Sequence, residues 1–222
     1  MELFEAMRTT FSAREYTSDP LPDDVLFEIL DNARFAPSGG NRQGVHITIV
    51  RNQTTKKTLS DLAIPAAKRY IAQINLGENP WNSASPTAAD EATIEATTPA
   101  PMLTETFINA DVVLVFSVDL KVVASMDQYL DRVGVVSGGS VYPMVWNTLL
   151  AARQAGFGGT MTTLAISQED KIQTLLGIPK DHAVCAIMPL GKPVKQLTKL
   201  RRNPVEFFVT QERFDGAPFT KP

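Results

Sequence analysis

The chain has 222 residues, of which 44% are hydrophobic and 20% are charged. This length allows one domain with a sizeable core, and the composition is that of an ordinary globular protein. The formal net charge of −3 gives no basic surplus that would attract nucleic acid. No apolar stretch reaches the ~18 residues of a membrane span, and the N-terminus lacks a secretory pattern. We therefore expect a cytoplasmic protein without membrane contact.

Helical and strand-like patterns follow one another along the chain. Apolar residues recur at helical spacing in some segments, and short β-branched or continuously apolar runs occur in others. The segments predicted as helices are 3–7, 23–36, 55–75, 122–132, 141–155 and 168–176. The segments predicted as strands are 46–50, 111–118 and 184–190, of which 111–118 is apolar enough to be buried on both faces. Pro65 is expected to kink or restart its helix, and Pro143 to lie in the first turn of its own.

Residues 77–101 differ in composition from both of their flanks. They contain four prolines, many Ala, Thr and Ser residues, and Trp81 as the one large aromatic. A loop this long inside a compact domain is usually functional or disordered, and we predict a mobile lid. Trp81 fits two roles equally well, either as a cover over a cleft or as an anchor that fastens the loop to the surface.

The most informative stretch is segment 36–43, Ala-Pro-Ser-Gly-Gly-Asn-Arg-Gln, between a predicted helix and a predicted strand. Pro37 breaks the helix, and the two glycines let the backbone approach a ligand closely. Asn41 and Gln43 offer the paired donors and acceptors that can bind the edge of a heteroaromatic ring. Taken alone, a plain polar loop is the simpler interpretation.

Other segments carry groups that suit a phosphate or a polar ligand. Thr10, Ser12 and Arg14 would lie on one side of an extended segment. Arg201 and Arg202 form a basic pair near the end of the chain. Guanidinium groups bind phosphate through two parallel hydrogen bonds. Gly158, Gly159 and Thr160 offer bare backbone amides after a helix. Each piece alone also fits a solvated face, ordinary surface charge or a helix stop.

Several enzyme signatures are missing from the sequence. No Gly-x-Gly-x-x-Gly follows a strand, and neither a P-loop nor a Gly-x-Ser-x-Gly motif occurs. Cys185 is the single cysteine, and its apolar neighbours predict a buried strand with an inert core thiol. His46 and His182 are the only histidines, and neither has a second ligand at metal-site spacing, so no metal site is expected.

Taken in this order, the pieces resemble the FMN-dependent nitroreductase family from about Leu3 to Pro204. The motifs that carry the resemblance are Ser12-x-Arg14-x-Tyr16, the helix and loop 26–43, the strand 111–118, the segment 149–158, Gly191-Lys192-Pro193 and Arg202-Asn203-Pro204. The resemblance implies an α+β fold, with a central, mostly antiparallel sheet wrapped by helices, in a homodimer that binds FMN at its interface. Residues 1–222 would form one domain, with 77–101 as the lid and 205–222 as a C-terminal extension.

The same resemblance assigns residues to FMN. They are Arg8, Ser12, Arg14, Pro37, Ser38, Gly39, Asn41, Gln43, Gly159, Thr160, Arg201 and Arg202. Ser12 and Arg14 would contact the ribityl chain, phosphate or pyrimidine edge, and Arg202 would hold the phosphate with Arg201 in reserve. The turn 37–41 of the partner chain would line the isoalloxazine ring, and the amides of residues 159–160 would approach its middle ring.

Many relatives carry a basic residue where this chain has Thr10 and Phe11, and we expect Arg8 to replace it. The extension contains four phenylalanines that could pack on a partner chain or on their own chain, and we favour the partner. These residues are Phe207, Phe208, Phe214 and Phe219.

The resemblance implies a ping-pong oxidoreductase. NADH or NADPH would reduce FMN, which would then reduce a small-molecule acceptor such as a nitroaromatic or a quinone. Because the flavin carries the chemistry, no catalytic side chain and no metal is expected. Three alternatives stay open: a reductive dehalogenase or flavin-cleaving relative on the same fold, a non-enzymatic FMN-binding or redox-sensing protein, and a domain without a cofactor.

Overall fold

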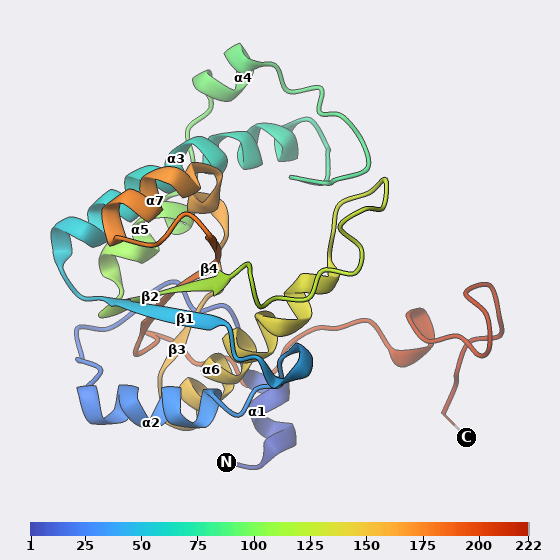
Figure 1. The fold of residues 1–222 in the computed structure, drawn as a ribbon, viewed down its shortest axis with the longest axis horizontal. Coiled ribbons are helices and arrows are strands. Elements are labelled where there is room, and N and C mark those ends of the chain that lie inside the picture. Colours follow the sequence, from blue (N-terminus) through green and yellow to red (C-terminus); the bar gives the residue numbers. More distant parts are fainter. Residues whose placement is uncertain (222) are drawn as a thin grey trace.

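Strand β2 (Val112–Asp119) lies at the centre of the structure, a computed structural model that describes residues 1–221 (Figure 1). Its residues from Val112 to Val118 are all buried, as expected for a strand that is covered on both faces. Leu114 and Phe116 pack with helices α2 and α6 on one face, whereas Val113 and Val115 pack with α3, α5 and α7 on the other. The alternation of side chains along β2 therefore divides the core into two clusters.

The sheet has four strands in the order β1-β2-β4-β3, and every pairing is antiparallel. The other strands are β1 (Val45–Val50), β3 (Gly158–Gly159) and β4 (His182–Gly191). The helices are α1 (Leu3–Thr9), α2 (Asp23–Ala33), α3 (Gln53–Asn75), α4 (Glu91–Ala96), α5 (Pro101–Asn109), α6 (Tyr142–Gln154) and α7 (Glu169–Leu176). Within residues 1–221, four 3₁₀ turns complete the elements: η1 (Gly39–Asn41), η2 (Val136–Ser140), η3 (Leu164–Gln168) and η4 (Val205–Phe207). The predicted mixture of helices with an antiparallel sheet is confirmed.

Most predicted helices and strands are present with small shifts of their ends. Pro143 lies in the first turn of α6, as expected. Pro65 lies within α3, which runs on as one helix past it, with the proline exposed on the surface. Strand β3 was not predicted, because two glycines carry no hydrophobic pattern. No helix among residues 1–221 is long and apolar enough to cross a membrane.

The helix predicted at 122–132 is wrong, because this segment forms turns around the carboxylate of Asp127. Asp127 is only 3% exposed. Its Oδ2 accepts hydrogen bonds from the amides of Val135 (2.7 Å) and Val136 (3.2 Å), and from Nη1 of Arg132 (2.8 Å). The Val135 amide, followed by the Arg132 guanidinium, lowers the pKa of Asp127 to about 2. Bonds between a side chain and a distant backbone replace the helical ladder here.

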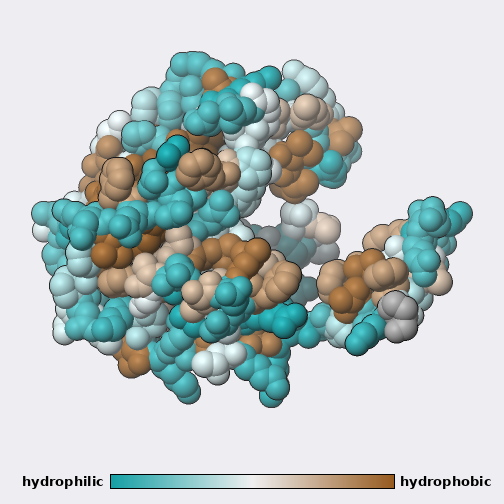
Figure 2. Space-filling model, turned by 90° about the horizontal axis from the view of Figure 1, so that it is seen from below, coloured by the Kyte–Doolittle hydropathy of each residue, from teal (hydrophilic) through white to brown (hydrophobic). Residues whose placement is uncertain are grey.

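The predicted lid is attached to the body of the structure, whereas the C-terminal segment is not packed against it. The predicted lid 77–101 contains α4, which is fastened to α3 by the ion pair of Lys68 with Glu95 (2.9 Å). The C-terminal arm, defined as residues 205–221, stands off the body in Figures 1 and 2, with apolar surface gathered on it. All four of its phenylalanines are exposed. Pro222, the last residue of the predicted extension, lies outside the described residues.

Candidate functional site

Segment 12–14 runs beside strand β3. The Ala13 amide donates to the Gly159 carbonyl over 2.9 Å, and the Ala13 side chain is buried. Ser12 is exposed and Arg14 half-buried on the opposite side of the segment, as the extended alternation predicts. Thr10 breaks the pattern, because it is buried and its hydroxyl donates to the Ala6 carbonyl over 2.7 Å. The structure thus presents Ser12 and Arg14 together along the edge of the sheet.

Tyr16 holds this segment in place from the interior. Its hydroxyl oxygen lies 2.7 Å from the Ala13 carbonyl and 3.0 Å from the Pro189 carbonyl. Burial raises the pKa of Tyr16 well above its usual value, so the hydroxyl stays protonated and available as a donor.

The glycines of β3 allow close packing of the backbone against its neighbours. A Cβ atom at Gly159 would lie 2.5 Å from the Pro189 carbonyl oxygen, and one at Gly158 would lie 2.9 Å from Cγ of Pro193. The expected ligand-facing amide of Thr160 instead donates to the Pro189 carbonyl over 3.3 Å. The Thr160 hydroxyl is buried without a hydrogen-bond partner among the described residues. Thr160 therefore belongs to the interior in this structure, contrary to the expectation.

A basic hollow of about 420 Å³ is lined by Arg8, Lys199 and Arg202, together with Met7, Thr198 and Leu200. Within residues 1–221, none of the three cations forms an ion pair with a carboxylate. Arg201 does not line this hollow, and its carbonyl accepts from Nη1 of Arg202 over 2.6 Å. The structure thus brings Arg8 and Arg202 to one hollow and adds Lys199. The signal for Lys199 was its place in the basic run before Arg202.

The 37–43 turn packs elsewhere, against the segment 122–140. The Gly39 amide donates to Oγ of Ser140 over 3.0 Å, and Nη1 of Arg42 donates to the Val122 carbonyl over 3.2 Å. Oγ of Ser38 accepts from the amide of Gln43 over 3.0 Å, which closes the turn.

The side chains of this turn that were predicted to contact the cofactor ring are exposed to solvent. Asn41 and Gln43 have positive φ angles of 53° and 51°, and both are exposed, as is Pro37. Across residues 1–221, no hydrogen bond joins this turn to Ser12, Arg14 or the basic hollow. In one chain, then, the turn bonds to the segment 122–140 and not to the other predicted cofactor residues.

An aromatic hollow of about 900 Å³ lies beneath the start of the predicted lid. Tyr70, Trp81 and Tyr142 line it, with Thr163 and Leu164 at the start of η3. An apolar hollow with a few polar groups is the usual form of a small-molecule site. Of these five residues, only Trp81 was predicted to lie at a ligand cleft. Tyr142 was not, because it falls on the apolar face of a predicted helix, a position that is equally typical of the core.

Trp81 combines the two roles that its sequence context left open. Its amide donates to Oε1 of Gln73 over 3.1 Å, and Gln73 is only 1% exposed. The Arg69 guanidinium lies 4.3 Å from the centre of the indole ring. The backbone is thus anchored to α3 while the ring lines the hollow.

Cys185 also lines the aromatic hollow. The side chain is partly buried rather than enclosed in the core, which differs from the expectation. Burial, followed by the nearby Glu169 carboxylate, raises the pKa of Cys185 to about 11. The thiol stays protonated at neutral pH, in keeping with an unreactive group.

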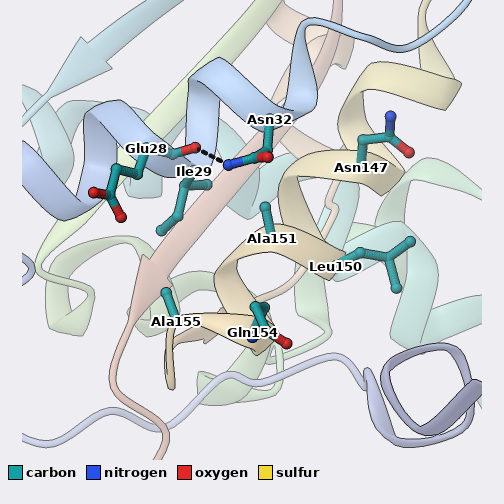
Figure 3. Close-up of a pocket in the computed structure, with 8 residues that line it drawn as sticks. All are labelled: Glu28, Ile29, Asn32, Asn147, Leu150, Ala151, Gln154 and Ala155. Carbon is teal, nitrogen blue, oxygen red and sulfur yellow. Dashed lines mark hydrogen bonds between the residues drawn. The ribbon is translucent and has the colours of Figure 1, made fainter. Parts of the chain in front are cut away.

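A further hollow of about 480 Å³ lies between α2 and α6. Figure 3 shows Asn32 donating to the Glu28 carbonyl, a bond of 2.8 Å, with Leu150 and Gln154 on the facing helix. None of the predicted cofactor residues lines it. The basic hollow, the Ser12–Arg14 edge and the aromatic hollow therefore remain the candidate site.

Comparison with known proteins identifies the family. A model of the Nitroreductase family matches residues 7–192. The chain belongs to the nitroreductase family. It is 26% identical over 204 residues to a protein named NADH dehydrogenase from Thermus thermophilus, a match that covers 88% of each chain. It is 23% identical over 212 residues to iodotyrosine deiodinase from Nematostella vectensis, covering 92% of this chain and 73% of that protein.

Solved structures of this family share the fold. The NADPH:FMN oxidoreductase from Vibrio harveyi, solved in complex with NAD⁺, superposes with a TM-score of 0.68 at 20% identity. The match covers 96% of this chain and 77% of that one. The family predicted from the ordered motifs is therefore confirmed.

Proposed function

We propose that this nitroreductase-family protein binds FMN and uses NADH or NADPH to reduce a small-molecule acceptor, such as a nitroaromatic or a quinone, by a ping-pong mechanism. When bound, FMN supplies the redox chemistry, because it can take a hydride from a nicotinamide and pass two electrons to an acceptor. The overall reaction with a quinone is balanced, since NAD(P)H and one proton give NAD(P)⁺ and the quinol.

The basic hollow carries this proposal. The phosphate of FMN has close to two negative charges at neutral pH and needs charge-assisted donors when it leaves water. Arg8, Lys199 and Arg202 line one hollow and are free of carboxylate partners within residues 1–221. Three cations held together without counter-charges repel one another, and a bound dianion would relieve that repulsion.

The neighbouring residues suit the remainder of the cofactor. The exposed Ser12 and the half-buried Arg14 lie along the edge of β3 and would contact the ribityl chain or the ring edge. A guanidinium such as Arg14 would stabilise the negative charge that a flavin gains on reduction. The aromatic hollow under Trp81 offers an apolar place for the planar rings of donor and acceptor.

We also propose a homodimer with FMN at the interface. Two observations support it: in one chain the 37–43 turn bonds to the segment 122–140 rather than to the Ser12–Arg14 edge, and the C-terminal arm exposes its phenylalanines. In a dimer, the turn of the partner subunit would complete the ring site. Aromatic side chains bury ~150–250 Å² each, so four per arm exchanged in both directions approach a standard interface of roughly 1,600 Å².

Anaerobic spectroscopy tests the proposed function. The purified protein should show the flavin absorption bands, lose them on addition of NADPH, and regain them on addition of a nitroarene or a quinone. A colourless protein that is not stabilised by added FMN contradicts the cofactor assignment. A yellow protein that NADPH does not reduce would be an FMN-binding protein rather than a reductase.

Reductive dehalogenation is the second candidate, because the iodotyrosine deiodinase relative matches over 92% of this chain. Reduced protein reoxidised by an iodophenol with release of iodide, but not by a nitroarene, would favour it over the proposed function.

A further inference from the structure

A smaller hollow of about 270 Å³ adjoins the aromatic hollow. Tyr142 and Cys185 line both, so the two hollows meet at these residues. We call the smaller one the side hollow. It lies between the end of β2, the start of β4 and the segment 133–141.

The lining of the side hollow is aliphatic. Its apolar residues are Val118, Leu120, Val123, Val135, Val141 and Ala183. The remaining residues are uncharged, namely Gly134, Ser137, Gly138, Tyr142 and Cys185. The Tyr142 hydroxyl donates to the Cys185 carbonyl over 3.4 Å. Such a surface gains free energy by contact with hydrocarbon, and none of its lining side chains carries a charge that could pair with an ionised ligand group.

The roof of the side hollow is held in place by Asp127. The Asp127 carboxylate accepts from the Val135 and Val136 amides, and a Cβ atom at Gly134 would lie 3.5 Å from Oδ1 of Asp127. At the wall, a Cβ atom at Gly138 would lie 2.9 Å from the Tyr142 ring. The segment is therefore fitted closely around one buried carboxylate and one aromatic ring. A preformed hollow loses little conformational entropy when a ligand enters.

We propose that the side hollow binds an aliphatic tail of the electron acceptor, such as the alkyl or prenyl chain of a quinone whose ring lies in the aromatic hollow. This inference rests on the proposed reductase function. The adjoining position at Tyr142 lets one molecule span both hollows. The acceptors favoured by this protein are then ring compounds with an apolar chain rather than a charged substituent.

A homologous series tests the inference. The holoenzyme is assayed anaerobically at saturating NADPH with 1,4-naphthoquinones that carry no chain or chains of one to seven carbons at position 2. Burial of a methylene contributes ~0.8 kcal/mol, so kcat/KM should rise up to about fourfold per carbon and level off when the side hollow is full. A flat response along the series overturns the inference.

Variants that fill the side hollow provide a second test, with a surface substitution as the matched control. Ser137→Phe should flatten the chain-length response, and Val135→Phe, at an exposed lining position, serves if the first variant does not fold. Ser18→Phe places the same ring on exposed surface outside both hollows and should keep the full response. An equal response in all three variants shows mere partitioning of hydrophobic quinones and overturns the inference.

Calorimetric titration of the same quinones without NADPH separates this inference from the proposed function. Affinity that increases with chain length, and that Ser137→Phe abolishes, supports the side hollow even if no quinone is turned over. Turnover of the unsubstituted quinone with no chain-length effect in either measurement leaves the reductase function standing and removes the side hollow.

Discussion

The Ala13 amide donates to the Gly159 carbonyl over 2.9 Å, which joins an N-terminal segment to the short edge strand β3. This bond fixes Ser12 and Arg14 on the outer side of their segment, beside the sheet edge. Residues that are almost 150 positions apart in sequence thus form one surface. The proposed cofactor site depends on this contact, because no single helix or loop contains its residues.

Arg202→Met should weaken FMN binding by about 10- to 100-fold, because one hydrogen bond to a charged group contributes ~1.5–3 kcal/mol. Titration of the apoprotein with FMN, followed by quenching of flavin fluorescence, measures the change. Arg201→Met is the matched control, since Arg201 does not line the basic hollow. A larger loss at Arg201 than at Arg202 would reverse the phosphate assignment.

Gly159→Ala should destabilise the fold by about 1–3 kcal/mol, as overpacking in a filled interior does. The added Cβ atom would lie 2.5 Å from the Pro189 carbonyl oxygen, which belongs to the sheet. Gly139→Ala is the control, because its Cβ atom would meet nothing within 4 Å. Urea unfolding of the two variants should differ clearly, and equal midpoints would show that β3 is not packed as described.

Tyr16→Phe should lower the free energy of unfolding by about 1 kcal/mol, because two carbonyls lose the hydroxyl that faces them. The exposed Tyr129→Phe should change it by less than about 0.5 kcal/mol. The Tyr16 variant should also bind FMN more weakly, since segment 12–14 loses its support. Wild-type stability together with wild-type FMN affinity would contradict this positioning role.

Asp127 should make the protein sensitive to acid. The pKa of Asp127 in the folded state is about 2, below its ordinary value of 3.8, so ionised Asp127 contributes stability above about pH 4. That contribution is lost as the pH falls from about 4 to 2. The melting temperature of Asp127→Asn should be lower than that of wild type at pH 7, with the gap closing toward pH 2. A constant gap across this range would argue against the ionised Asp127 contacts.

The sequence was sufficient for the parts of the fold that depend on local pattern. Val112 to Val118 form an apolar run that only Ser117 interrupts, and a strand buried on both faces follows from that run alone. The prediction of a helix at 122–132 was wrong because the spacing of apolar residues does not show which groups Asp127 bonds. The Asp127 carboxylate accepts hydrogen bonds from the amides of Val135 and Val136, which lie beyond the predicted helix. Such contacts between a side chain and a distant backbone override helix propensity.

The candidate site was predictable only where its residues carry a chemical signal. Arg8 and Arg202 are cations in a suitable order along the chain, and the structure brings them to one hollow. Tyr142 and Thr163 line the aromatic hollow but show no such signal, because a tyrosine on a helix and a threonine in a loop have many other uses. Thr160 looked available beside two glycines, yet the pairing of β3 with β4 turns it inward.

Comparison of FMN with riboflavin isolates phosphate binding by the basic hollow, because the two ligands differ only in the phosphate. If Arg8, Lys199 and Arg202 bind that group, the apoprotein should hold FMN at least about 100-fold more tightly than riboflavin. The preference should fall to within about tenfold in the Arg8→Met/Arg202→Met double variant. Equal affinity of the wild-type protein for the two flavins would contradict the account.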